Sequence, residues 1–335
     1  MASPATSPAT ATQNPARASI TVDRPADFDE YWQAGLDELA AVDAAPLLTL
    51  RLDLSTPEID VFDVRYSGTG DVRVAAWYTR PTGEAPTGGW PGLLLIPGYI
   101  SDPVVAKSWS LRGYAVLSVA ARGKLRAMDP VNPGYPGLLV DTIVDPYSYT
   151  YRAFYLDTVR GFDILAALPE IDPMRIGVHG SSQGGGLGVV VAALRPGAVA
   201  CLSAGAPYMC GIMDSVRLTY TYPYQEIREY LTVHPDHYAL VERTASYVDA
   251  LNLAAQVTCP TQVYIGLRDD VCPPETGFAL VDALPGEVEF HAYPGAGHDA
   301  GLPAVANEID RFLAEHLQPV GGSSRREADT SRSNA

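Results

Sequence analysis

The spacing of hydrophobic residues predicts a helix near the start of the chain. From residue 28 to residue 39, apolar side chains recur at steps of three and four positions, which places them on one helix face. They are Phe28, Tyr31, Trp32, Leu36 and Leu39. Asp27 precedes this stretch, and Glu30 follows three positions later. This spacing is typical of the capping box that begins a helix.

Two kinds of strand-like segment follow, and they differ in the arrangement of their apolar residues. Residues 47–52, 59–66 and 72–78 are short, alternating runs divided by Pro, Gly and Asp, as expected for antiparallel strands. Continuous apolar runs come next, which is typical of parallel strands covered on both faces. These runs are residues 92–97, 115–120, 175–179 and 261–265.

Helical stretches alternate with the apolar runs, and this alternation predicts the fold class. The helical stretches are residues 155–168, 185–194, 274–284 and 304–317. We therefore expect an α/β protein with a mostly parallel, doubly wound sheet flanked by helices. No linker divides the chain, so we expect one domain over residues 21–318. Residues 1–20, rich in Ala, Ser, Thr and Pro, and residues 319–335 are expected to be disordered.

Charge and composition narrow the classes of partner. The net charge of −16 on 335 residues should repel nucleic acid and anionic membranes, so we expect neither as a partner. No apolar run approaches the ~20 residues that span a membrane. The first residues also lack the apolar stretch of a signal peptide, and we expect a cytoplasmic protein. The four cysteines form no CxxC pair, which favours buried, reduced thiols.

The segment Gly180-Ser181-Ser182-Gln183-Gly184 matches G-x-S-x-G, the nucleophile elbow of α/β-hydrolases. In this motif the serine occupies a strained strand-to-helix turn, and the glycines let neighbouring backbones pass closely. A predicted strand ends at the motif and a predicted helix begins after it, which is the context that the motif requires. A turn without chemistry is the alternative, while a phosphate loop would need a lysine after its glycines. Ser182 is the predicted nucleophile.

A serine hydroxyl needs a base that takes its proton, and in this fold the base is a histidine late in the chain. His298 stands in a Gly-rich loop after a strand-like stretch at the expected place. His291 and His316 fall within the predicted strand and the terminal helix. His234 and His237 suggest a metal site, but a proline lies between them and no third ligand is near. We therefore predict His298 as the base and expect no metal.

The acid and the oxyanion donors are predicted from their positions after strands. Asp269 and Asp270 both follow the apolar run that ends at residue 265, and spacing alone does not choose between them. An oxyanion hole takes one N–H from the residue after the nucleophile, which is Gln183. The other comes from the loop after an early strand, where Tyr99 of Pro97-Gly98-Tyr99 is the candidate.

The chain resembles the acetyl xylan esterase and cephalosporin C deacetylase family, carbohydrate esterase family 7. The similarity runs from about residue 27 to residue 317. The segments that carry it are Asp27-Phe-Asp-Glu-Tyr-Trp32, Trp77-Tyr78, Arg80-Pro81, Gly98-Tyr99, Ala121-Arg122-Gly123, Tyr149-Thr-Tyr-Arg152, Leu156-Asp157, Gly180-Ser-Ser-Gln-Gly-Gly185, Glu226-Ile-Arg-Glu-Tyr230, Gly266-Leu-Arg-Asp269, Cys272-Pro-Pro274 and Gly297-His298. The run from Gly180 to Gly185 is more specific than the general motif because it adds a glutamine and a second glycine.

The resemblance implies which aspartate acts and which reaction is catalysed. The family's acid follows Gly-Leu-x, which is Asp269 here. The resemblance also implies Ser182 as nucleophile, His298 as base, and Tyr99 and Gln183 as oxyanion donors. It further implies hydrolysis of acetyl esters on short xylo-oligosaccharides or cephalosporins, without metal or cofactor, by an intracellular protein that forms hexamers.

Two positions depart from the family pattern. Lys124 stands where the family's Arg-Gly-Gln has glutamine, and Asp299 stands where its His-Glu has glutamate. Both substitutions bear on loop packing, oligomer contacts or substrate choice, so they bear on the acetyl preference and the hexamer.

Three alternatives to a small-molecule acetyl esterase stay open at this stage. A broader short-chain carboxylesterase or a peptidase can use the same fold and the same site, because fold does not determine substrate. A non-catalytic scaffold is the third alternative, although candidates for all three catalytic residues are present. If the protein is an esterase or a peptidase, the expected mechanism passes through an acyl-enzyme on Ser182.

Overall fold

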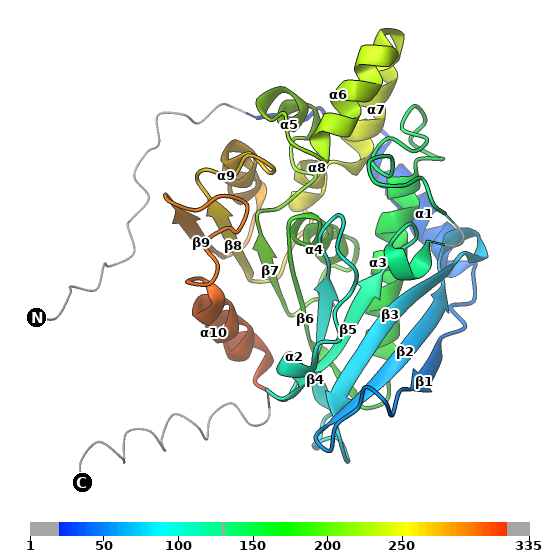
Figure 1. The fold of residues 1–335 in the computed structure, drawn as a ribbon, viewed down its shortest axis with the longest axis vertical. Coiled ribbons are helices and arrows are strands. Elements are labelled where there is room, and N and C mark those ends of the chain that lie inside the picture. Colours follow the sequence, from blue (N-terminus) through cyan, green and yellow to red (C-terminus); the bar gives the residue numbers. More distant parts are fainter. Residues whose placement is uncertain (1–19, 129–130, 320–335) are drawn as a thin grey trace, which may run out of the picture.

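A nine-stranded mixed sheet forms the centre of the molecule (Figure 1). The structure, a computed structural model, describes residues 20–128 and 131–319. The strand order is β1-β2-β3-β5-β4-β6-β7-β8-β9. The predicted disordered ends, 1–20 and 319–335, lie outside the described residues except for Ile20 and Pro319.

Three antiparallel strands lie at one edge of the sheet, where the sequence alternates between apolar and polar residues. They are β1 (Leu47–Leu50), β2 (Ile59–Ser67) and β3 (Arg73–Pro81). The strand β3 also pairs antiparallel with β5, and from there every pairing is parallel. The antiparallel prediction for residues 47–78 is therefore confirmed.

The parallel part of the sheet contains the continuous apolar runs. Its strands are β4 (Trp90–Ile96), β5 (Ala115–Ala120), β6 (Ile171–Ser181), β7 (Cys201–Gly205), β8 (Thr261–Gly266) and β9 (Val288–Tyr293). Every residue of β4, β5, β7 and β8 is buried, because helices cover both faces. The predicted α/β class with a mostly parallel sheet is confirmed, and the carboxyl ends of these strands lie at one edge, where such sheets carry their sites.

Helices cover both faces of the sheet. They are α1 (Phe28–Ala40), α2 (Lys107–Ser110), α3 (Thr150–Ala167), α4 (Gln183–Leu194), α5 (Ile212–Leu218), α6 (Tyr224–Val233), α7 (Tyr238–Val248), α8 (Ala250–Ala254), α9 (Pro274–Ala283) and α10 (Ala306–Leu317). On β6, Val178 lies against Gly188 of α4, while its neighbour Gly177 lies against Leu317 of α10. Successive residues of a strand point to opposite faces, so α4 and α10 cover opposite faces of the sheet.

The structure corrects the prediction for the start of α1. Asp27 makes no capping hydrogen bond with its side chain. Its Oδ1 instead accepts a 2.5 Å hydrogen bond from the hydroxyl of Tyr247 on α7. The capping-box prediction was wrong because a distant tyrosine binds the carboxylate that the local pattern assigns to the helix.

The described residues agree with two expectations on composition. All four cysteines are free and buried. Within the described residues, no helix is both long enough and apolar enough to cross a membrane.

Candidate active site

Ser182 lies at a sharp turn between β6 and α4, as the elbow motif predicts. It has φ +60° and ψ −123°, a backbone conformation that costs energy for a residue with a side chain. Hydrogen bonds hold this conformation in place. The Ser182 N–H donates to Gly205 O at 2.8 Å, and the Ser182 carbonyl accepts from the N–H of Gly185 at 3.0 Å and of Tyr208 at 3.0 Å.

The glycines around Ser182 are required because other backbones lie against them. A Cβ on Gly184 would lie 2.0 Å from Ile96 O at the end of β4, and one on Gly180 would lie 2.6 Å from the backbone of Gly184. A Cβ on Gly186 would lie 1.8 Å from Tyr208 O. The turn can therefore form only with bare backbone at these positions. This packing also brings the end of β4 beside the first turn of α4.

His298 links Ser182 to Asp269. Its Nε2 lies 3.0 Å from Ser182 Oγ, and its Nδ1 lies 2.9 Å and 3.1 Å from the two carboxylate oxygens of Asp269. The Asp269 side chain is 1% exposed, whereas that of His298 is 32% exposed. The Oδ1 of Asp269 also accepts from the N–H groups of Val271 at 2.8 Å and Cys272 at 2.9 Å, which fixes the carboxylate toward the imidazole. The structure thus brings all three predicted residues together.

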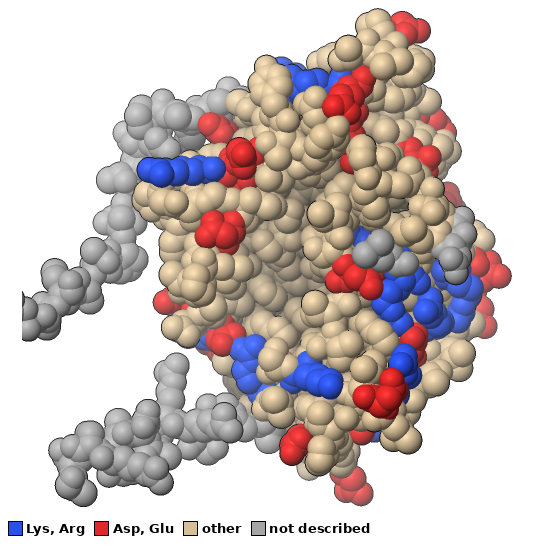
Figure 2. Space-filling model, in the orientation of Figure 1, with Lys and Arg blue, Asp and Glu red and all other residues tan. Residues whose placement is uncertain are grey.

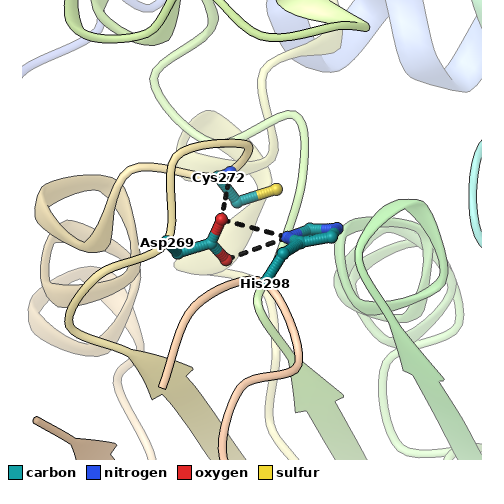
Figure 3. Close-up of side chains that lie close together, drawn as sticks. All are labelled: Asp269, Cys272 and His298. Carbon is teal, nitrogen blue, oxygen red and sulfur yellow. Dashed lines mark hydrogen bonds and ion pairs between the residues drawn. The ribbon is translucent and has the colours of Figure 1, made fainter. Parts of the chain in front are cut away.

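Asp270, the competing aspartate, lies outside this arrangement. Its side chain is exposed, whereas that of Asp269 points inward to His298 (Figure 3). Adjacent residues in the loop after β8 point in different directions, so only one carboxylate reaches the histidine. Asp299, one of the two departures from the family pattern, accepts a 2.9 Å hydrogen bond from the N–H of Gly297 and stabilises the turn that carries His298.

The predicted oxyanion donors lie on the two backbones that the elbow brings together. Gln183 is the first residue of α4, so its N–H has no partner within the helix. Tyr99 lies in the loop after β4, and within the described residues its N–H donates to no backbone carbonyl. The Tyr99 hydroxyl donates to Glu226 at 2.6 Å, and Glu226 in turn accepts from the N–H groups of Gly137 and Leu139.

Buried tyrosines form the wall behind this site. The Tyr151 hydroxyl donates to Gln183 Oε1 at 3.0 Å, and the rings of Tyr99 and Tyr208 have centroids 6.3 Å apart. Burial raises the pKa of Tyr151 and, together with the charge of Glu226, that of Tyr99. These hydroxyls therefore stay protonated and act as hydrogen-bond donors.

One residue next to the site was not predicted to act there. Lys124 is 1% exposed, and its ammonium donates to the carbonyl oxygens of Gly98 and Tyr99. It also lines a narrow space together with Pro97 and Gln183. The contact joins residues some 25 positions apart, and no local pattern in the sequence signals it.

In the part of the chain that the structure describes, two groups of side chains have the composition of a metal site. Asp269, Cys272 and His298 offer ligand atoms within 4.8 Å of one another (Figure 3), but Asp269 and His298 already bind each other there. Glu289, His291 and Glu308 form the other group, in which Glu289 is bound by Arg311 at 2.5 Å. Within the described residues, His234 and His237 belong to neither group.

Comparisons with known proteins identify the family of the chain. The family model described as acetyl xylan esterase (AXE1) matches residues 19–316. The chain is 26% identical over 270 residues to acetyl esterase Axe7A of Xylanibacter ruminicola. This match covers 76% of the chain but only 59% of that relative, so the chain spans little more than half the length of the relative.

Two solved structures are similar over nearly their full length. An acetyl xylan esterase from Paenibacillus sp. R4 matches with a TM-score of 0.83 and 31% identity, over 89% of this chain and 96% of that one. Acetyl xylan esterase 1 from Thermoanaerobacterium sp. JW/SL YS485 matches with a TM-score of 0.81 and 28% identity, over 88% and 95%. With its elbow serine, its buried carboxylate and its matching fold, the chain belongs to the acetyl xylan esterase family of carboxylic ester hydrolases.

Proposed function

We propose that this protein is a serine esterase that removes acetyl groups from small acetylated substrates through an acyl-enzyme on Ser182. Acetylated xylo-oligosaccharides and cephalosporin C-like esters are the substrates that we propose. The observation that carries the proposal is the unbroken line of hydrogen bonds from Ser182 Oγ through His298 to the buried Asp269. This geometry fits a hydroxyl that must lose its proton as it attacks a carbonyl carbon.

In the first step His298 Nε2 takes the proton of Ser182 while the serine oxygen bonds to the ester carbonyl carbon. The negative charge that develops on the carbonyl oxygen accepts hydrogen bonds from the N–H groups of Tyr99 and Gln183. The proton on His298 then passes to the alcohol oxygen, the carbon–oxygen bond of the ester breaks, and the acetyl group stays on Ser182. Asp269 stabilises the imidazolium and keeps the proton on Nδ1.

In the second step a water molecule takes the place of the alcohol. His298 accepts a proton from the water, whose oxygen attacks the acetyl carbonyl in the same oxyanion site. The intermediate collapses when His298 returns the proton to Ser182 Oγ, which releases acetate. The 32% exposure of the His298 side chain supports this step, because water can reach the imidazole.

The distribution of charge on one face of the molecule is compatible with a substrate that is uncharged at its reacting end. Figure 2 shows a hollow near the centre of this face with few charged side chains on its walls. An ester of a sugar hydroxyl carries no charge at its reacting end, so its binding needs no ion pair. Family membership supports acetate as the acyl group.

A series of nitrophenyl esters tests the acyl preference. We expect kcat/KM to fall by about tenfold or more between acetate and butyrate, and again at octanoate, because a site shaped for acetyl excludes added methylenes. Acetylated xylobiose and cephalosporin C should then release acetate. A preference for octanoate would contradict the acetyl proposal, and hydrolysis of peptides in preference to all esters would favour a peptidase.

A further inference from the structure

Lys124 is a buried cation beside the loop that carries Tyr99. Within the described residues its ammonium binds two carbonyl oxygens, those of Gly98 and Tyr99, and no carboxylate. A buried ammonium is costly unless its hydrogens are bound, and burial lowers the pKa of Lys124 to about 7. Since the buried ammonium destabilises the fold, we expect it to have a specific role at the loop that carries Tyr99.

The chain directs Lys124 inward through the two residues before it. The Arg122 guanidinium binds the carboxylate of Asp157 on α3 at 2.8 Å, which anchors the segment after β5. Gly123 follows with φ +77°, a conformation that glycine adopts without strain. The N–H of Lys124 then donates to Ala121 O at 3.1 Å and closes a tight turn. This turn sends the lysine side chain under the loop after β4.

Lys124 binds the carbonyl of Gly98, and this carbonyl belongs to the same peptide group as the Tyr99 N–H, the proposed oxyanion donor. The cis peptide bonds of the described residues all precede prolines, so the bond between Gly98 and Tyr99 is trans. In a planar trans peptide the C=O and the N–H point in opposite directions. Because Lys124 binds the Gly98 carbonyl from within the protein, the Tyr99 N–H must point away from the buried ammonium.

This peptide group needs such an anchor because of the residue before it. Gly98 has no Cβ, so rotation of the peptide between Gly98 and Tyr99 meets little steric resistance. Besides the bond from Lys124, its carbonyl accepts a 3.3 Å hydrogen bond from the Ser101 N–H. A rotated peptide would present a carbonyl oxygen to the developing oxyanion and would repel it. The second bond, from Lys124 to the carbonyl of Tyr99, holds the following peptide as well.

We propose that Lys124 is a positioning residue of the acyl-transfer site, which anchors the Gly98 carbonyl and so directs the Tyr99 N–H toward the oxyanion. The inference rests on the proposed esterase mechanism, since it assigns a cause to the orientation of one of its two donors. In this role Lys124 acts on the backbone of Gly98 and Tyr99 and not on the substrate itself.

Lys124→Met tests the proposal because methionine keeps the length of the side chain but donates no hydrogen bond. Removing one oxyanion donor lowers kcat by about 10²–10³-fold, so freeing this donor to rotate should lower kcat for nitrophenyl acetate by about 10–100-fold. KM should change by less than about threefold, because the ground-state ester needs this donor little. Lys124→Gln, which restores a neutral donor, should recover a large part of the loss.

Lys107 supplies the matched control. It is the only other lysine of the chain and the first residue of α2, and the side-chain hydrogen bonds to the Gly98 and Tyr99 carbonyls come from Lys124 instead. Lys107→Met should keep the kcat of the wild-type enzyme. Inactive wild-type protein would contradict the esterase proposal itself. An active wild type with an equally active, folded Lys124→Met would overturn only the role of Lys124.

The pH dependence of kcat tests the role of Lys124 even if Lys124→Met does not fold. Among the described residues, Asp102 is the charge that acts on the ammonium, and the residues that line the narrow space beside Lys124 from β5, α3 and α4 are neutral: Val119, Phe154, Thr158 and Gln183. Charge-assisted hydrogen bonds are about twice as strong as neutral ones, so wild-type kcat should fall by about threefold or more as pH rises through about 7. Lys124→Gln should lack this decrease, and an identical decrease in Lys124→Gln would overturn the proposal.

Discussion

Replacing Ser182 with alanine is expected to lower kcat for nitrophenyl acetate by about 10⁴–10⁶-fold, because no other group can carry the acetyl intermediate. The Oγ is the atom that lies 3.0 Å from His298 Nε2, and alanine removes it without changing the backbone. Binding of the ester should survive, since the change removes one oxygen atom and leaves the other groups of the site in place. Steady-state hydrolysis at saturating ester measures the loss.

Ser181→Ala is the matched control for this prediction. Ser181 is the last residue of β6 and the direct neighbour of Ser182, but no catalytic step uses its hydroxyl. We expect its kcat to stay within about threefold of the wild-type value, as for an ordinary substitution away from the reacting atoms. If Ser182→Ala kept even a tenth of wild-type activity, Ser182 would not be the nucleophile.

The second large effect is expected for Asp269→Asn, with a loss of about 10⁴-fold in kcat. The amide can still accept the N–H bonds of Val271 and Cys272, so the loop should keep its shape. It presents an N–H to His298 Nδ1, however, and this favours the tautomer whose Nε2 carries a hydrogen. Such an Nε2 cannot accept the proton of Ser182, and it cannot gain stabilisation from a carboxylate.

Asp270→Asn makes the same chemical change one position further along the chain. Its side chain is exposed and takes no part in the hydrogen bonds that link Ser182, His298 and Asp269, so kcat should stay within about threefold of wild type. Measuring both variants with the same ester separates the two aspartates that spacing alone leaves open. A large loss in Asp270→Asn together with an active Asp269→Asn would reverse the assignment.

Much of the site could be predicted because its signals are local in the sequence. The glycines at positions 180 and 184 indicate where two backbones must lie in contact, and the structure shows that contact with Ile96 at the end of β4. The order of serine, aspartate and histidine along the chain indicates which strand ends meet. Parallel strands with continuous apolar residues predict the sheet, because burial on both faces leaves no polar positions.

The parts that could not be predicted depend on contacts between distant residues. The local pattern at Asp27 is a sound helix cap, yet the Tyr247 hydroxyl binds that carboxylate from α7. Lys124 looks like a surface cation by residue type, since lysine is rarely buried. Only the fold shows that two main-chain carbonyls bind its ammonium. The four helices between β7 and β8 were likewise not predicted, because they pack on other helices: α5, α6 and α7 on one another, and α8 on α4 and α9.

The most direct test of the account is to locate the covalent intermediate with diethyl p-nitrophenyl phosphate. The Ser182 oxygen attacks phosphorus, nitrophenolate leaves, and the stable phosphoryl ester that remains cannot be hydrolysed readily. After digestion, mass spectrometry should find one diethylphosphoryl group per chain, on the peptide that contains Ser182, and none on Ser182→Ala. A label on another residue, or full esterase activity in protein labelled at Ser182, would contradict the mechanism.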